Sequence, residues 1–96
     1  MITFEERVIK TAEILKILGH PVRLKILSLL ADNISRKLTV TQIQEILRLT
    51  QPETSKHLTL MKAQSILNCE KRGGNSYYSI NDEYPFIRCV INQIQK

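Results

Sequence analysis

Residues 49–61 read LTQPETSKHLTLM, and this stretch contains the sharpest helix start in the chain. Thr50 is a residue type that caps helices, and Glu53 stands where its side chain can return a hydrogen bond to the cap. Pro52 lies in the first turn, where its missing N–H does no harm. We therefore expect a helix that begins after Thr50 and continues to about Gln64.

The two faces of this helix differ in character. An inward face is expected from residues spaced by four and three positions, namely Thr54, Leu58 and Met61. A shorter helix precedes it over about residues 42–47, where Thr39 and Gln42 repeat the capping spacing. Its inward face should carry Ile43, Ile46 and Leu47. The sequence thus predicts two short helices joined by a tight connection.

The pattern after residue 64 changes from a helical period to short extended runs. Residues 66–71 and 76–80 read as two strands. Between them, Gly73 and Gly74 supply the positive φ angles that a hairpin turn requires. We therefore expect a β-hairpin directly after the second helix of the pair.

Further helices are expected toward both ends of the chain. The first covers about residues 5–18, and the second starts at Pro21 and ends at Asp32–Asn33. The last helix covers about residues 82–95, with Asn81 as its cap. The first helix has an apolar stripe made of Phe4, Val8, Ala12, Leu15 and Leu18.

The expected order is therefore α-α-α-α-β-β-α, a mainly helical chain with a small β-hairpin. Two short helices, a tight turn and a following basic hairpin are typical of a winged helix-turn-helix. With 96 residues, the chain is expected to form one such domain over residues 1–96. The helix-turn-helix would cover residues 39–64 and the wing residues 66–80.

Composition narrows the class of protein. The apolar fraction of 43 % excludes a disordered chain, and the formal net charge of +5 favours polyanionic partners. Two cysteines cannot form the framework of a disulfide-rich secreted protein. The N-terminus is charged, and no apolar run approaches the about 18 residues that span a bilayer. We expect a cytoplasmic protein with no membrane attachment.

Polar and basic side chains gather on the outer face of the helix that follows Thr50 and on the hairpin. In a helix-turn-helix, the second helix lies in the major groove of double-stranded DNA, and Gln, Ser and Lys offer the donors and acceptors that base edges and phosphates bind. The wing can grip an adjacent phosphate or the minor groove. The candidate DNA contacts are Gln51, Ser55, Lys56 and Thr59 on the helix and Lys71, Arg72 and Asn75 on the hairpin.

Three stretches resemble the ArsR/SmtB family of dimeric winged-helix repressors. Residues 12–30 (AEILKILGHPVRLKILSLL) are similar to the opening of the family, and residues 49–58 (LTQPETSKHL) to its recognition helix. Residues 71–80 (KRGGNSYYSI) are similar to its wing. Together these matches lie within about residues 12–81.

This resemblance implies how the protein would work. It implies a homodimer formed by residues 1–18 and 82–96, an imperfect palindrome as the operator, and repression that a bound effector relieves. By position, it adds His57 to the candidate DNA contacts. It does not identify the effector.

The metal sites of this family do not carry over to this chain. The stretch that would hold a Cys-x-Cys, residues 39–42, has no thiol, and residues 83–94 have no histidine. Soft metals need several thiolate or imidazole ligands that converge on one point. We therefore expect no metal and no cofactor.

Cys69 and Cys89 leave two interpretations open. They could sense thiol chemistry through a disulfide, a persulfide or a soft metal shared across the dimer, or each could be a small, partly buried apolar residue. His20 is expected to cap the second helix.

A winged helix-turn-helix chain of this kind is compatible with two classes of function. The first is a sequence-specific DNA-binding repressor, and the second is a winged helix that binds proteins without DNA affinity. An enzyme is not expected, because Ser55 and His57 are two positions apart on a helix and point in different directions, and no third residue orients the histidine.

Overall fold

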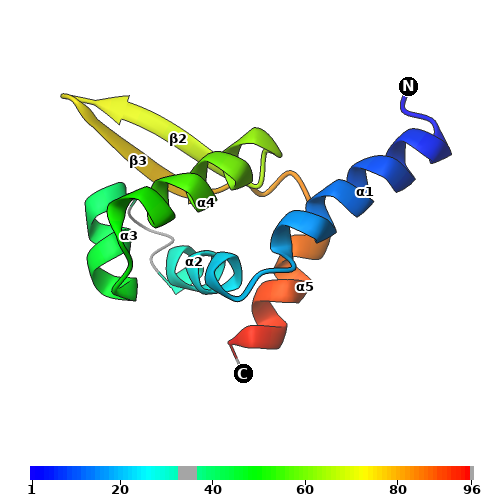
Figure 1. The fold of residues 1–96 in the computed structure, drawn as a ribbon. Helices are drawn as coiled ribbons and strands as arrows, with labels where there is room; N and C mark the ends of the chain where they lie inside the picture. The colour runs from blue at the N-terminus through cyan, green and yellow to red at the C-terminus, as the bar shows by residue number, and fades with distance from the viewer. Residues whose placement is uncertain (33–36, 96) are drawn as a thin grey trace.

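The computed structural model describes residues 1–32 and 37–95. Helices and strands follow one another along the chain, as Figure 1 shows, in the order α1 (Phe4–Leu18), α2 (Pro21–Asp32), β1 (Leu38–Thr39), α3 (Val40–Leu47), α4 (Gln51–Ala63), β2 (Leu67–Arg72), β3 (Asn75–Ile80) and α5 (Pro85–Ile94). The fold is the expected winged helix-turn-helix, mainly helical with a small antiparallel sheet.

A third strand, β1, was not predicted. It pairs antiparallel with β3, with Leu38 opposite Tyr78 and Thr39 opposite Tyr77, so the sheet order is β1-β3-β2. Two residues are too short a run to display the alternation that marks a strand. The ends of the two predicted hairpin strands are correct to within one or two residues. Both strands and the turn that sets their register are neighbours in the sequence, so local patterns are enough to predict them.

The predicted start of the last helix at residue 82 is wrong. The helix α5 begins at Pro85, and its N-cap, Tyr84, makes no side-chain capping bond. Asn81 instead orders the turn before the helix, because its Oδ1 accepts a hydrogen bond from Glu83 N at 3.0 Å and its Nδ2 donates one to Ser65 O at 2.8 Å. Proline is favoured at the first helical position, which fixes the start.

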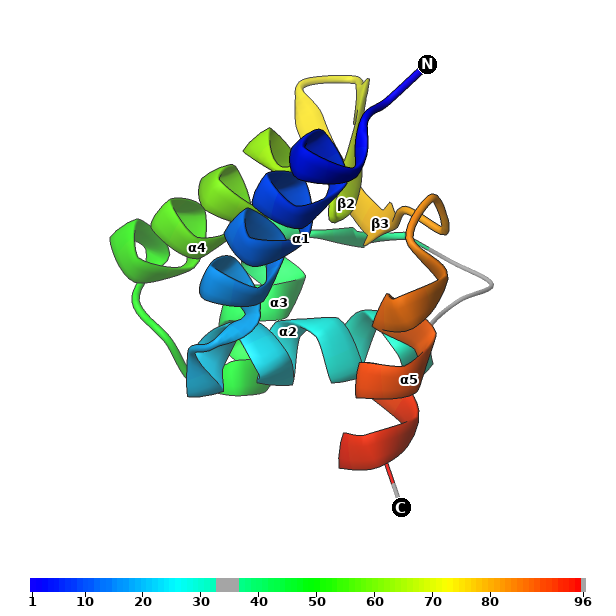
Figure 2. The same cartoon turned by 90° about the vertical axis from the view of Figure 1, so that its right-hand side faces the viewer.

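The helix α2 lies at the centre of the molecule and contacts α1, α3, α4, α5 and β3 (Figure 2). It ends at Asp32, and the predicted end residue Asn33 lies outside the described residues. His20 caps its start as expected, since Val22 N donates a hydrogen bond to His20 Nδ1 at 3.1 Å. The buried core consists of Ile14, Leu18, Ile26, Leu27, Leu30, Leu38, Ile43, Leu58, Met61, Ile66, Leu67, Tyr78, Ile87 and Ile91.

Two apolar groups lie outside this core. The side chain of Ile46, predicted to face inward, is 54 % exposed on α3. Only Leu18 of the apolar stripe on α1 is buried, whereas Phe4, Val8 and Leu15 are exposed. None of the helices described is both long enough and apolar enough to cross a membrane.

Candidate nucleic-acid interface

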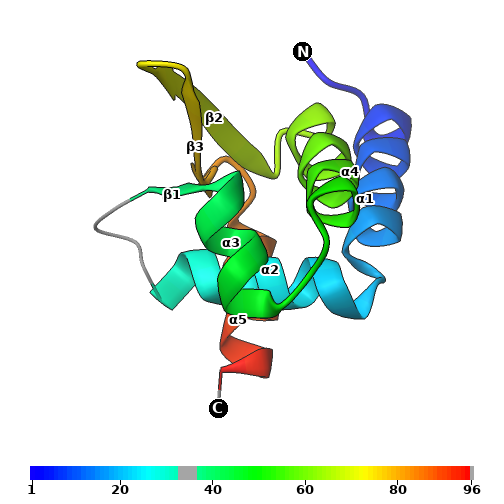
Figure 3. The same ribbon diagram turned by 60° about the vertical axis from the view of Figure 1, so that its left-hand side comes forward.

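The helices α3 and α4 are joined by a tight turn with defined geometry at each end (Figure 3). At the start of α3, Thr39 Oγ1 accepts from Gln42 N at 3.2 Å and Gln42 Oε1 accepts from Thr39 N at 2.9 Å, which is the predicted capping box. At the end of α3, Arg48 adopts left-handed φ and ψ angles of 56° and 50°. Leu49 N then donates to Gln44 O at 3.0 Å, so the turn closes on α3.

Thr50 is the N-cap of α4, as predicted. Its Oγ1 accepts from Glu53 N at 3.3 Å, and its carbonyl oxygen accepts from the buried Thr54 hydroxyl at 2.8 Å. Within the described part of the chain, the Glu53 side chain does not complete the box, and the same holds for Glu6 at the Thr3 cap of α1. One side-chain bond and Pro52 are thus enough to start α4 at the expected residue.

The outer face of α4 carries most of the predicted polar residues. Gln51, Lys56 and Thr59 are exposed, and Ser55 is half-buried. The opposite face is buried, and it consists of Thr54, Leu58 and Met61 as predicted, together with His57. The helix therefore presents donors and acceptors outward from its N-terminal half while its inner face holds it on the core.

His57 does not belong to this outer face, and we remove it from the candidate DNA contacts. Its side chain is 4 % exposed, and its Nδ1 accepts a hydrogen bond from Arg23 Nε at 3.1 Å. The ring of His20 lies 4.6 Å away between ring centroids. Burial, followed by the charges of His20 and Arg23, lowers the pKa of His57 below its ordinary value of 6.5.

The wing is the hairpin of β2 and β3, which projects from the body of the molecule (Figure 1). Its two turn residues, Gly73 and Gly74, have φ angles of 52° and 86°. Lys71, Arg72 and Asn75 are exposed beside this turn. Because side chains alternate along a strand, Arg72 and its partner Asn75 share one face, and Lys71 points to the other.

The face that holds Arg72 carries an ion-pair network that the sequence interpretation missed. Glu70 accepts a hydrogen bond from Arg72 Nε at 2.8 Å and another from Lys37 Nζ. These two bonds lower the pKa of the Glu70 carboxyl. The two-residue spacing of Glu70 and Arg72 on a strand predicts that pair, but Lys37 joins it only because β1 pairs with β3.

The two cysteines lie on different elements and are free thiols. Cys69 is half-buried on β2, opposite Tyr78 of β3, and Cys89 is exposed on α5. Burial, together with a hydrogen bond to Cys69, raises the pKa of the Tyr78 hydroxyl. Tyr78 belongs to the core and anchors the wing, whereas Tyr77 is half-buried on the opposite face of β3. The described residues contain no cluster of three or more potential metal ligands.

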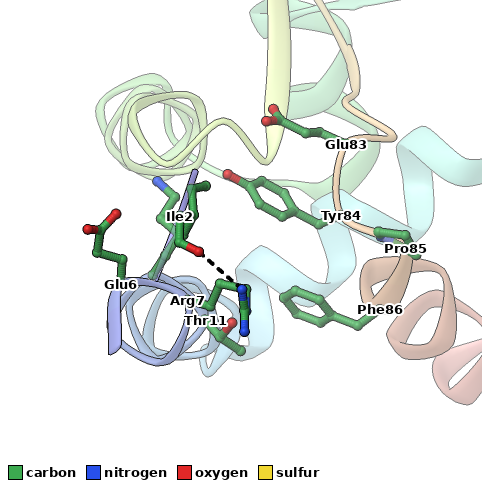
Figure 4. Close-up of a pocket in the computed structure, with 9 residues that line it drawn as sticks. Ile2, Glu6, Arg7, Thr11, Glu83, Tyr84, Pro85 and Phe86 are labelled. Carbon is green, nitrogen blue, oxygen red and sulfur yellow. Dashed lines mark hydrogen bonds between the residues drawn. The ribbon is translucent and has the colours of Figure 1, made fainter. Parts of the chain in front are cut away.

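A cavity of about 530 Å³ lies apart from α4 and the wing, between α1 and the segment that leads into α5 (Figure 4). The rings of Tyr84 and Phe86, with centroids 6.2 Å apart, line one side. On the α1 side, an Arg7 Nη atom donates to Ile2 O at 3.2 Å. The cavity thus lies between two segments, residues 1–18 and 82–96, that the family resemblance implies form the dimer.

Comparison with known proteins gives concordant results. A model of the family described as "Bacterial regulatory protein, arsR family" matches residues 20–68. An HTH-type transcriptional regulator of Methanocaldococcus jannaschii is 38 % identical over 90 residues, which is 93 % of this chain and 99 % of that protein. The transcriptional repressor PagR of Bacillus anthracis is 44 % identical over 71 residues, which is 74 % of this chain and 69 % of PagR.

Solved structures agree with this result. The crystal structure of PagR matches with a TM-score of 0.79 and 37 % identity, covering 93 % of this chain and 97 % of that one. A homodimeric winged helix-turn-helix DNA-binding domain from Mycobacterium bovis matches with a TM-score of 0.77 and 23 % identity, covering 97 % of this chain and 85 % of that one. The second match concerns the fold alone.

Proposed function

Because the chain belongs to the arsR family of bacterial regulatory proteins, we propose that it is a DNA-binding transcriptional repressor that acts as a homodimer. The relative PagR is itself a transcriptional repressor. The observation that carries the proposal is the exposed, polar N-terminal half of α4, held by the Thr50 cap beside a basic wing.

In this proposal, α4 is the recognition helix and lies in the major groove of the operator. Gln51 and Ser55 contact base edges, and Lys56 contacts a base or a nearby phosphate. Their shared position on the first two turns of α4 supports this assignment, because the N-terminal residues of a recognition helix reach the bases. Arg72 and Asn75 on one face of the wing, or Lys71 on the other, contact the adjacent backbone.

Dimer formation is supported by the exposed side of α1. The side chains of Phe4, Val8 and Leu15 are 68 %, 46 % and 52 % exposed, and they line one shallow hollow. Exposed apolar residues that gather in this way mark an interface, and a domain of this size gains stability from a partner. Two copies joined here would present two α4 helices to a palindromic operator, with half-sites about 34–36 Å apart.

The test is selection of bound duplexes from a random pool, followed by affinity measurements at several salt concentrations. We expect an enriched palindrome and a Kd that rises steeply with salt, since Lys and Arg release counterions from phosphates. Absent binding, or binding that does not respond to salt, would contradict this function and favour a winged helix that binds proteins only.

A further inference from the structure

Arg23, at the start of α2, connects three helices. One of its Nη atoms donates to Ile17 O near the end of α1 at 3.1 Å, and its Nε donates to His57 Nδ1 on α4 at 3.1 Å. The ring of His20, which caps α2, packs against the ring of His57 with an angle of 53° between the two ring planes. We call Arg23, His20 and His57 the Arg–His joint. It lies on the inner side of α4, behind the outward residues Ser55 and Lys56.

Both imidazoles of the joint act as hydrogen-bond acceptors. His57 Nδ1 accepts from Arg23, and His20 Nδ1 accepts from Val22 N at 3.1 Å. A neutral histidine that accepts at Nδ1 carries its proton at Nε2. A second proton on the His57 ring would sit on Nδ1 and face the Arg23 Nε–H donor, so protonation of His57 removes the bond and replaces it with repulsion.

We propose that the Arg–His joint positions the recognition helix, and that the protein binds DNA only while His57 is neutral. This inference rests on the proposed function. His57 is the neighbour of Lys56 and shares a helical turn with Ser55, so displacement of its ring shifts both candidate DNA contacts. Two further charged groups act on the ring, since Glu53 favours its protonation and Lys56 opposes it.

The lowered pKa of His57 fixes the direction of the pH effect. The unfolded chain binds a proton at His57 more readily than the native protein does. The contribution of neutral His57 to the free energy of unfolding is therefore fully present above about pH 6.5, and it is lost as the pH falls through the pKa of the native state. The effect on DNA binding has the same sign. An exposed histidine at the DNA surface would do the opposite, because its positive charge would strengthen the attraction to phosphates.

The test measures the affinity of the full chain for a duplex recovered by the selection, at constant ionic strength, from about pH 7.5 to about pH 5.5, where histidines titrate. We expect the wild-type Kd to rise by less than about tenfold at about pH 5.5, because the apparent Kd increases as the fraction of neutral His57 falls and the pKa of His57 lies below 6.5. Circular dichroism at each pH verifies that the protein is folded. Constant or tighter binding at low pH by folded protein would overturn the inference.

Two variants separate positioning from simple structure. In His57→Asn, the Asn Oδ1 replaces Nδ1 as acceptor and does not titrate, so binding near pH 7.5 should persist and the loss at low pH should disappear. His20→Asn retains a good helix cap and leaves His57 to titrate, so the loss should persist and begin at a higher pH, because the charge of His20 no longer lowers the pKa of His57. An unchanged pH profile in His57→Asn would overturn the inference.

A direct titration adds a readout that needs no variant. The ring resonances of His57, followed by NMR, should titrate at a lower pH in the DNA complex than in the free protein, because binding and protonation exclude each other. Equal titration in both states would overturn the inference. Failure to bind any duplex near pH 7.5 would instead contradict the repressor function, and this inference with it.

Discussion

The hydroxyl of Thr54 contacts the residue that caps α4, so it is a sensitive probe of how the helix starts. Its side chain is fully buried, and Oγ1 donates to Thr50 O at 2.8 Å, on the residue that caps the helix. Thr54→Val keeps the shape and β-branching of the side chain and removes this bond. We expect the free energy of unfolding to fall by about 1 kcal/mol, because the side-chain hydrogen bond to Thr50 O is lost, although the bond from Thr54 N to the same oxygen remains.

Urea denaturation measures this change, and Thr59→Val provides the matched control. Thr59 is exposed on the same helix, and surface substitutions usually change stability by less than about 0.5 kcal/mol. Equal losses in the two variants would show that the valine itself, rather than the lost bond, lowers stability.

Residues of α4 also show where sequence interpretation stops. Thr54, Leu58 and Met61 could be placed inside because their spacing is a property of the helix alone. His57 could not, because its partner Arg23 lies 34 positions earlier in the chain and no local pattern connects the two. The position of His57 beside Lys56 therefore predicts the outer face, whereas the structure buries its side chain.

At the scale of elements, α4 can be tested as the recognition helix. Ser55→Ala should relax sequence preference while leaving the salt dependence unchanged, and Lys56→Ala should weaken binding to all duplexes and reduce the salt slope by about 1. The double variant should lose specific binding and keep its fold. Titrations with selected and scrambled duplexes distinguish these effects.

Lys16→Ala is the control for the α4 variants, because Lys16 is an exposed lysine on α1. It removes the same charge as Lys56→Ala, but on a helix that carries none of the proposed DNA contacts. Unchanged affinity in the double variant, or an equal loss in Lys16→Ala, would remove α4 from the groove.

A substitution in the wing is expected to strengthen DNA binding, whereas those in α4 weaken it. Glu70 accepts hydrogen bonds from Lys37 and Arg72, so it partly neutralises the cations on one face of the wing, which we propose lies near DNA. Glu70→Gln should tighten binding at low salt and steepen the salt slope by about 1. Exposed ion pairs contribute only about 0–1 kcal/mol to stability, so the fold should persist.

Glu13→Gln makes the same charge change at an exposed position on α1 and should leave the salt slope unchanged. Weaker binding by Glu70→Gln would indicate that the carboxylate orients the two cations more than it neutralises them.

Elements differ in how completely the sequence specifies them. The start of α4 is predicted from Thr50 and Pro52, which lie two positions apart in the chain. The start of α5 was placed too early because Asn81 was interpreted as a helix cap, whereas it orders a turn with Glu83 and Ser65, and Pro85 sets the helix start. The strand β1 could not be predicted, since its pairing with β3 is long-range.

The sequence predicts the apolar stripe of α1 but not the surface against which this stripe packs in the whole molecule. A helical period indicates that apolar residues share one face of the helix. That face can pack either on the core of the same chain or on another subunit, and the period is the same in both cases. In the structure, α1 packs on the core through the buried Ile14 and Leu18 and the partly buried Ile17. The side with Phe4, Val8 and Leu15 is exposed in the single chain, and we propose that it packs against the partner subunit.

Two adjacent residues of α1 permit a matched test of this assignment. Val8 lines the apolar hollow, whereas Ile9 does not, and their side chains are 46 % and 56 % exposed. Consecutive residues of a helix point about 100° apart, so the same substitution falls on two different faces. Val8→Lys should bring two buried cations together across the interface, whereas Ile9→Lys should remain in solvent.

Sedimentation at micromolar concentration should find Val8→Lys monomeric and Ile9→Lys dimeric, with both variants folded. Val8→Lys should also bind a palindromic duplex no better than a single half-site, because the second α4 no longer reaches its groove in the same complex. A dimeric Val8→Lys protein that still prefers the palindrome would move the interface away from this side of α1, and the spacing of the two recognition helices would have to come from another contact.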